Sequence, residues 1–275
     1  MTFTVLGASG YIGSHLLNAL QQRPEAIVYA PSLAKTPYAI NELLDDDLGH
    51  IFYCIGLTAN FRKQPFATID AHVCLLRQLL EFGRFESLTY LSSTRVYECA
   101  NSTQESALLP VTPENSGHLY NISKLMGESL CLASGRNTKI VRLANVVGTA
   151  MTGQNFLTQV ITEAVKTGEV TFMTSANSAK DYVLIADVVR WLPDIALHGK
   201  QSIYNVASGI NTSNAELASL LTAQGIQVHF AENAPDWSFP VIDTQRLQQE
   251  FAPAQSSLAK EFTIIFDDIK RRHRG

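Results

Sequence analysis

Three polar side chains of this sequence are of types that can hold and move a proton. The segment "YNISK" places Tyr120 and Lys124 four residues apart, and therefore on one face of a helix. The ordinary pKa of a tyrosine, about 10, makes it a poor acid or base, but a neighbouring ammonium group favours the phenolate. The segment "LSSTRVY" (91–97) ends a predicted strand with Ser93, whose hydroxyl could orient a substrate oxygen. These residues could move a proton while a nicotinamide moves a hydride, unless Tyr120 and Lys124 are a chance pair on an exposed helix.

A glycine-rich loop lies upstream, between a short apolar strand and an apolar helical segment (12–20). In "TFTVLGASGYIG" the residues Gly7, Gly10 and Gly13 are spaced by three. Strand, glycine loop and helix in this order form a site for a dinucleotide pyrophosphate, because the chain can approach the phosphates and the helix offers free N–H groups. A purely structural turn is the alternative. The predicted cofactor contacts in this loop are Gly7, Ser9, Gly10, Tyr11, Ile12 and Gly13.

The elements that position these residues alternate between strand and helix. Predicted helices span 66–82 and 117–133, and the predicted strands are 26–30, 50–55, 87–93 and a strand with its loop over 139–148. Such alternation predicts a mostly parallel sheet covered on both faces. Ligands bind at the carboxyl ends of such strands, so Ser93 should face the same crevice as the glycine loop. After residue 148 the pattern loosens, with a helix at 156–167, a strand at 170–173 and a final helix.

Composition excludes several classes of protein. The net charge of −4 gives no indication of nucleic-acid binding, and the basic end (270–274) is typical of a solvated helix terminus. No apolar run reaches transmembrane length and no signal peptide is recognisable, so we expect a cytoplasmic protein without a membrane partner. The four cysteines lack metal-ligand spacing, which predicts reduced thiols and no metal site.

Several motifs together resemble the extended short-chain dehydrogenase/reductases, the NAD-dependent epimerase/dehydratase family. The resemblance covers nearly the whole chain and rests on "GASGYIG", "YCIGLT" (53–58), "SSTRVY", "YNISK", "RLANVVG" (142–148), "KDYVLIADVV" (180–189) and "YNVASG" (204–209). It implies an α/β fold, with a Rossmann-type doubly wound parallel sheet in 1–150 that parts of 181–209 complete. A small C-terminal substrate-binding domain would lie mainly in 151–275.

The resemblance also implies roles for individual residues. Ser93, Tyr120 and Lys124 would be catalytic, Tyr120 and Lys124 would also contact the cofactor, and Gly56 would lie along it. Arg95, Asn145, Asn155 and Lys180 would line the substrate pocket, although each asparagine could instead cap a turn or bind a loop carbonyl. A homodimer built from the helix at 66–82 and the helix carrying Tyr120 is the family's common assembly.

The cofactor segment departs from the family pattern after the second strand. NAD-using relatives carry an acidic residue there, whereas this chain reads "VYAPSLAK", with Ser32 and Lys35 nearby. No carboxylate would repel a 2′-phosphate, and either residue could bind one, so NADP is preferred over NAD. The alternatives are a loosely held NAD and an ordinary loop lysine at position 35.

The substrate segment departs as well. Relatives that act on nucleotide sugars bind the diphosphate with two arginines. Here Lys180 occupies the position of the first arginine, and Arg246, the first arginine in the segment where the second is expected, is predicted on a surface helix. Thr94 and Arg95 follow Ser93 where family dehydratases carry an Asp–Glu pair. A 4,6-dehydratase is therefore excluded, because neither side chain can supply the acid and base of an elimination.

The presence of Ser93, Tyr120 and Lys124 together predicts an enzyme that transfers hydride to or from a sugar-like carbonyl or alcohol. A nucleotide sugar is the family's usual substrate. We expect a ketoreductase rather than an epimerase, since the weakly specified adenosine end of the site favours exchange of the cofactor. The alternative is a dinucleotide-binding sensor or scaffold without turnover, which would not need Ser93, Tyr120 and Lys124.

Overall fold

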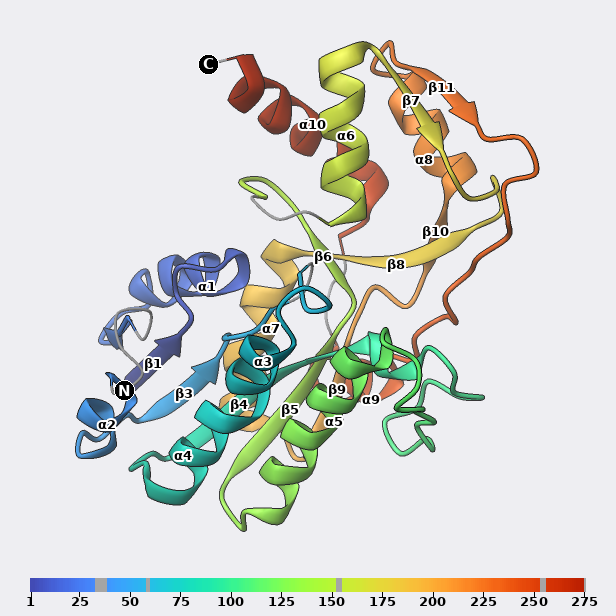
Figure 1. The fold of residues 1–275 in the computed structure, drawn as a ribbon. Coiled ribbons are helices and arrows are strands. Elements are labelled where there is room, and N and C mark those ends of the chain that lie inside the picture. Colours follow the sequence, from blue (N-terminus) through green and yellow to red (C-terminus); the bar gives the residue numbers. More distant parts are fainter. Residues whose placement is uncertain (33–38, 58–59, 152–154, 253–255, 275) are drawn as a thin grey trace.

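A six-stranded parallel sheet forms the centre of the molecule (Figure 1). The computed structural model describes residues 1–32, 39–57, 60–151, 155–252 and 256–274. The strand order is β2-β1-β3-β4-β5-β9, and every neighbouring pair is parallel. The strands are β1 (Thr2–Leu6), β2 (Ile27–Tyr29), β3 (His50–Tyr53), β4 (Ser87–Ser93), β5 (Thr138–Leu143) and β9 (Ile203–Val206). The predicted Rossmann-type doubly wound parallel sheet is confirmed, and its order reverses between β1 and β3, where ligands bind in such folds.

Helices cover both faces of this sheet. Side chains alternate along each strand, so Phe3 and Val5 of β1 enter the core under α1 (Tyr11–Gln21) and α7 (Ile185–His198). Leu6 enters the opposite core, beneath the helices α2 (Ala39–Leu44), α4 (Leu75–Phe82) and α5 (His118–Ala133). Because both faces are buried, the strands read as apolar runs rather than as alternating patterns.

Two predicted elements differ in the structure. The helix predicted over 66–82 is α3 (Pro65–Ile69) and α4 joined by a π-helical turn, η1 (Asp70–Cys74). The segment predicted over 139–148 divides at Ala144, because β5 stays in the central sheet while β6 (Asn145–Val147) pairs with another strand. Hydrophobic periodicity shows neither an extra residue in a helical turn nor a change of sheet.

A second group of elements lies beyond the ends toward which β1 and β3 point (Figure 1). It holds the small sheets β10-β8-β6 and β11-β7 and a core of its own around Phe172, Leu217, Phe262 and Phe266. Its further elements are α6 (Phe156–Thr167), β7 (Glu169–Phe172), β8 (Ala179–Leu184), β10 (Asn211–Ser213), α8 (Asn214–Thr222), β11 (Gln227–Phe230) and α10 (Leu258–Arg274). The helix α9 (Gln245–Phe251) packs against β9 instead.

A buried ion pair ties α5 to the central sheet. Glu128 of α5 and Arg142 of β5 are both almost fully buried, and their closest N–O distance is 2.6 Å. Ser92 donates a hydrogen bond to the same carboxylate, and Arg142 also donates to Tyr97 at 2.7 Å. Since Glu128 lies one helical turn after Lys124, the network fixes the end of β4 and the middle of α5 relative to each other.

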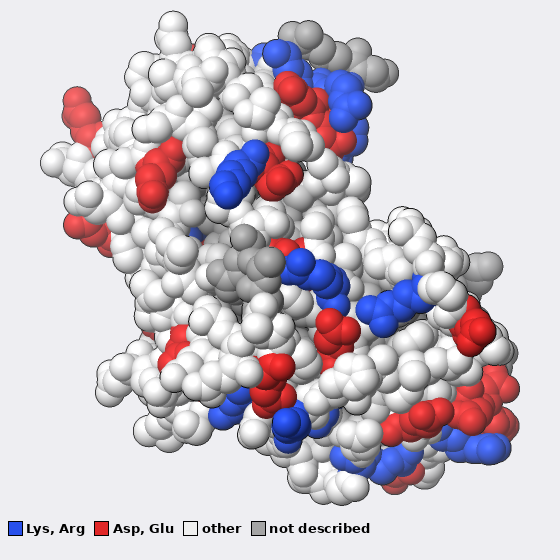
Figure 2. Space-filling view, turned by 180° about the vertical axis from the view of Figure 1, so that it is seen from behind, with Lys and Arg blue, Asp and Glu red and all other residues white. Residues whose placement is uncertain are grey.

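Charges of both signs are intermixed on the face seen from behind (Figure 2). No helix among the described residues is long and apolar enough to cross a bilayer. Within the same residues, no group of three metal-ligating side chains comes together. The four cysteines are free thiols.

Candidate active site

The glycine loop joins β1 to α1 at the point where the strand order reverses. Gly7 has a φ of +85°, and a Cβ there would lie 2.9 Å from the carbonyl carbon of Cys54. A Cβ on Gly13 would lie 2.2 Å from the carbonyl oxygen of Gly7, so both positions require glycine. The N-terminus of α1 has no side-chain cap and no acidic residue in its first turn. Its open N–H groups fit the pyrophosphate of a dinucleotide.

The other residues predicted to bind the cofactor lie around this loop. Ser9 is exposed and Ile12 is half-buried. The hydroxyl of Tyr11 is buried without a hydrogen-bond partner, and burial raises the pKa of Tyr11. Ser32 is exposed beyond the end of β2, whereas Lys35 lies outside the described residues.

Tyr120 lies in the first part of α5, packed against aromatic rings. Its ring centre is 5.4 Å from that of Phe61 and 5.4 Å from that of His72. Burial raises the pKa of Tyr120, while a hydrogen bond with the side chain of Ser93 and the positive charge of Arg95 lower it in part. The spacing of "YNISK" predicts such an electrostatic effect from Lys124. The structure adds Arg95 as a cation near the phenol, with its Cζ 5.9 Å from the centre of the Tyr120 ring.

Lys124 follows one helical turn later and is buried behind the site. Its Nζ donates a hydrogen bond to the carbonyl oxygen of Leu91 at 2.8 Å. Burial lowers the pKa of Lys124 to about 7, against the opposing effect of Glu128. The Nζ lies 3.4 Å from the place that a Cβ on Gly56 would occupy. The structure therefore brings the predicted Gly56 and Lys124 together, next to the switch point between β1 and β3.

His72 is a component of this cluster that the sequence analysis missed. It lies in the π-helical turn, and its Nε2 accepts a hydrogen bond from the backbone N–H of Leu57 at 3.2 Å. The proton is therefore on Nδ1, which lies 2.8 Å from the hydroxyl of Ser123. Ser123 in turn donates to the carbonyl oxygen of Tyr120 at 2.9 Å. A single histidine on a helix forms no recognisable motif in the sequence. Only the fold could show that His72 contacts both the loop after β3, at Leu57, and the helix α5, at Ser123.

The environment of His72 predicts a pH-dependent stability. Burial, with a smaller contribution from the charge of Lys124, lowers the pKa of His72 to about 3. Between this value and the ordinary histidine pKa of about 6.5, the unfolded chain binds more protons than the folded one, so stability falls as the pH falls. We expect the unfolding free energy of the wild type to fall more steeply than that of His72→Gln as the pH falls through that window. The difference between the two slopes should be about 1.4 kcal/mol per pH unit.

Urea unfolding of both proteins at several pH values between 7.5 and 4.5 measures this difference. His273→Gln, on the exposed end of α10, is the matched control and should keep the wild-type pH dependence. Parallel curves for the wild type and His72→Gln would contradict the assignment of His72 as a buried neutral histidine.

The four residues predicted to bind substrate do not share one set of contacts. Asn145 donates to the backbone oxygen of Asp181 at 2.8 Å, and Asn155 caps α6 by accepting from the N–H of Thr158 at 2.9 Å. Asn155 is thus a helix cap, close to the alternative given for it, whereas Asn145 binds a carbonyl of strand β8 rather than of a loop. The amine of Lys180 lies 4.0 Å from the ring centre of Phe156, and burial lowers its pKa. Arg95 lies beside Tyr120.

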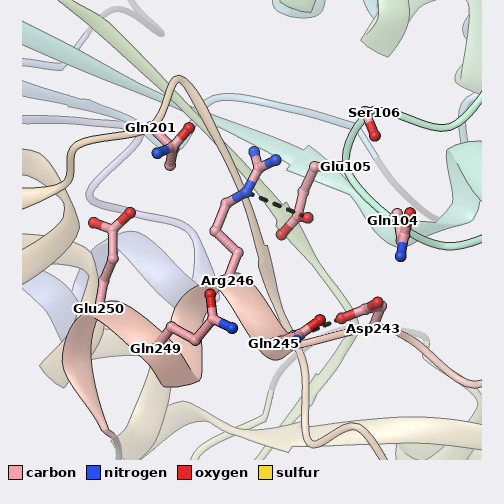
Figure 3. A pocket seen from close by; sticks show the side chains of 9 residues that line it. All are labelled: Gln104, Glu105, Ser106, Gln201, Asp243, Gln245, Arg246, Gln249 and Glu250. Carbon is pink, nitrogen blue, oxygen red and sulfur yellow. Dashed lines mark hydrogen bonds and ion pairs between the residues drawn. The ribbon is translucent and has the colours of Figure 1, made fainter.

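Arg246 belongs to a separate polar pocket between α9 and the loop after Tyr97 (Figure 3). Its Nε lies 3.5 Å from the carboxylate of Glu105, and its Nη1 donates to the carbonyl oxygen of Ile203 at 2.8 Å. This half-buried arginine lies on a helix, as predicted, and its charge is compensated. The pocket is lined by Gln104, Glu105, Ser106, Gln201, Asp243, Gln245, Arg246, Gln249 and Glu250.

The fold and the site define a Rossmann-type protein with a serine, a tyrosine and a lysine grouped near the carboxyl end of β4. The model of the NAD dependent epimerase/dehydratase family matches residues 3–207. The chain belongs to this family, as the sequence motifs indicated. No curated protein sequence gives a significant match.

Solved structures share this fold over their whole length at low sequence identity. The UDP-glucuronic acid 4-epimerase from Bacillus cereus, in complex with UDP-glucuronic acid and NAD, is 19% identical with a TM-score of 0.83, covering 99% of this chain and 100% of its own. RMD from Pseudomonas aeruginosa, complexed with NADPH, is 20% identical with a TM-score of 0.82, covering 98% and 99%. TunA, an NAD dependent NDP-hexosamine 5,6-dehydratase, is 20% identical with a TM-score of 0.79, covering 97% of each chain.

Proposed function

We propose that this protein transfers hydride between a nicotinamide cofactor and a sugar-like alcohol or carbonyl, with Tyr120 as its acid/base. The observation that carries the proposal is the grouping of Ser93, at the carboxyl end of β4, with Tyr120, whose pKa the serine side chain lowers, beside Lys124 and Gly56. A sensor or scaffold would not need this group of side chains. The nicotinamide, when bound, accepts or donates the hydride.

The side chains would divide the remaining work. Ser93 would orient the substrate oxygen, and Tyr120 would give its phenolic proton to that oxygen during reduction or take it during oxidation. Lys124 would bind the cofactor ribose and restore the proton of Tyr120, since a pKa of about 7 lets its amine hold or release a proton near neutral pH. The hydrogen bonds of His72 to Leu57 and Ser123 would keep these elements in place.

The substrate that we propose is a nucleotide sugar, and the reaction that we favour is ketoreduction. The relatives crystallised with UDP-glucuronic acid and with NADPH support a nucleotide-sugar substrate and a nicotinamide cofactor. A 4,6-dehydratase activity is not proposed, because Thr94 and Arg95 follow Ser93. The 5,6-dehydratase TunA shares the fold, so this exclusion rests on the chemistry of these two side chains.

Deuterium transfer tests the proposal and separates its variants. The purified protein would be incubated with 4-deuterated NADPH or NADH and a panel of UDP-, dTDP- and GDP-linked hexoses and 4-keto-hexoses. A ketoreductase places deuterium on the sugar carbon, whereas an epimerase inverts a hexose without net oxidation of the cofactor. The appearance of a 4-keto-6-deoxy product would overturn the exclusion of dehydration, and cofactor binding without any turnover would favour a sensor.

We also propose a homodimer through α4 and α5, the family's common assembly. Met126 and Leu132 of α5 and Phe82 of α4 are exposed large apolar side chains. Burying such side chains between two copies would stabilise a dimer. Light scattering at micromolar concentration should give twice the mass of the chain, and a monomer would count against this assembly.

A further inference from the structure

Two arginines from distant segments meet near Tyr120, the proposed acid/base. Arg62 follows the loop after β3, and Arg95 lies in η2 (Thr94–Tyr97), directly after β4. Their Nη2 atoms lie 3.1 and 3.6 Å from the point that a Cβ on Gly117 would occupy. Gly117 precedes α5, so the absence of a side chain there leaves room for both guanidinium groups at the start of the helix that carries Tyr120.

Aromatic faces support both guanidinium groups. The Cζ of Arg62 is 4.6 Å, and that of Arg95 5.4 Å, from the centre of the ring of Phe61, which is 1% exposed. Arg95 is also 5.9 Å from the ring centre of Tyr120. Cation–π contacts hold the guanidinium groups near the rings while leaving their N–H groups able to bind an oxyanion in a bidentate manner.

The positive charge of this pair is only partly compensated. Arg95 has one carboxylate near it, that of Glu98, whose oxygen is 3.5 Å from Nε and also accepts a hydrogen bond from Asn121. The Nε of Arg95 is buried without a hydrogen bond of its own. Across the described part of the chain, Arg62 has no ion pair with a carboxylate. Two adjacent cations with one carboxylate leave a net positive charge, which an anionic ligand would neutralise.

We propose that Arg62 and Arg95 bind a carboxylate carried by the sugar ring of the substrate, so that the protein prefers a hexuronate-type nucleotide sugar over a neutral hexose. This inference rests on the proposed function for the identity of the reacting group. The anion belongs to the sugar rather than to the diphosphate, because the Cζ of Arg95 lies 5.9 Å from the ring centre of Tyr120, the residue proposed to contact the reacting sugar oxygen. In a hexuronate the carboxylate is attached to the carbon next to C4, so it can reach the arginines while the C4 oxygen reaches Tyr120.

Calorimetric titration with two probes, UDP-glucuronate and UDP-glucose, tests this site on the full chain in saturating NAD. We expect UDP-glucuronate to bind at least tenfold more tightly than UDP-glucose. Arg62→Met and Arg95→Met should each weaken UDP-glucuronate binding on the order of tenfold, the usual size of a charged hydrogen bond, and change UDP-glucose binding by less than about twofold. Arg62 is exposed, so its variant carries the test even if Arg95→Met does not fold.

Arg77→Met is the matched control. Arg77 is an exposed arginine of α4 paired with Glu81, and its removal should leave both affinities unchanged. Equal affinities of the wild type for the two probes, failure of both to bind, or an unchanged preference in Arg62→Met would each overturn the inference. Selective binding of UDP-glucuronate without any hydride transfer would instead overturn the proposed function and leave the carboxylate site standing.

Discussion

Tyr120→Phe should lower turnover by about a hundredfold or more, the usual contribution of a general acid or base, while leaving cofactor affinity nearly intact. The substitution removes the phenolic oxygen that hydrogen-bonds to Ser93 but keeps the ring that packs against Phe61 and His72. The variant should therefore fold like the wild type. Steady-state rates on the substrate found by deuterium transfer, together with titration of the cofactor, measure both halves of this expectation.

A second tyrosine provides the control for this substitution. Tyr182→Phe removes a buried hydroxyl from β8, in the second group of elements, and should leave turnover close to the wild-type value. Unimpaired activity of Tyr120→Phe would show that another group donates the proton. If Tyr120→Phe instead lost its cofactor affinity to the same extent as its activity, the tyrosine would be part of the cofactor site rather than the acid/base.

The pH profile of the reaction should report Arg95 rather than Lys124 as the cation acting on the phenol. The positive charge of Arg95 lowers the pKa of Tyr120, so its removal in Arg95→Met should move the alkaline side of the pH–rate profile of reduction to higher pH. Rates of the wild type and the variant between pH 6 and 10 measure this shift, and coincident profiles would contradict it.

The parts of the fold and site that the sequence predicted depend on local patterns. Apolar runs separated by helical segments were sufficient to predict a parallel sheet, because the helix that connects two parallel strands packs against a face of that sheet. The glycine loop was recognisable from the spacing of its glycines between an apolar strand and a helical segment. This spacing reflects the structure, because Gly7 and Gly13 meet backbone atoms that exclude any Cβ. The "YNISK" segment was recognisable because its tyrosine and lysine share one helical face.

The remaining parts of the site depend on contacts between distant segments. The helical elements α3, η1 and α4 and the strand β4 separate Arg62 from Arg95, and only the fold brings both next to Phe61 and Gly117. The role of His72 depends on a π-helical turn, which no propensity predicts. The hydrogen bond of Lys124 to Leu91 and its burial could not be predicted, because sequence spacing gives the face of a helix but not the direction of a long side chain.

Gly10→Val should abolish binding of both nicotinamide cofactors while the protein still folds. Gly10 has an extended backbone (φ −78°, ψ 167°) that valine adopts readily, and a Cβ there would meet only the carbonyl oxygen of Gly7, at 3.3 Å. The valine side chain would instead occupy the space in front of the free N–H groups of α1, where the pyrophosphate is expected. Calorimetric titration of NADP(H) and NAD(H) against the wild type should also show the tighter affinity for NADP(H), as Ser32 in place of an acidic residue predicts.

Gly13→Ala separates this loss of binding from a loss of structure. Its Cβ would lie 2.2 Å from the carbonyl oxygen of Gly7, so the loop or α1 must move and the free energy of unfolding must fall. Gly10→Val should keep an unfolding transition close to that of the wild type, because its Cβ contact with Gly7 at 3.3 Å requires a much smaller shift than the 2.2 Å contact at Gly13. Binding of either cofactor by Gly10→Val at wild-type affinity would place the pyrophosphate elsewhere, and equal or tighter affinity of the wild type for NAD(H) would remove the argument from Ser32.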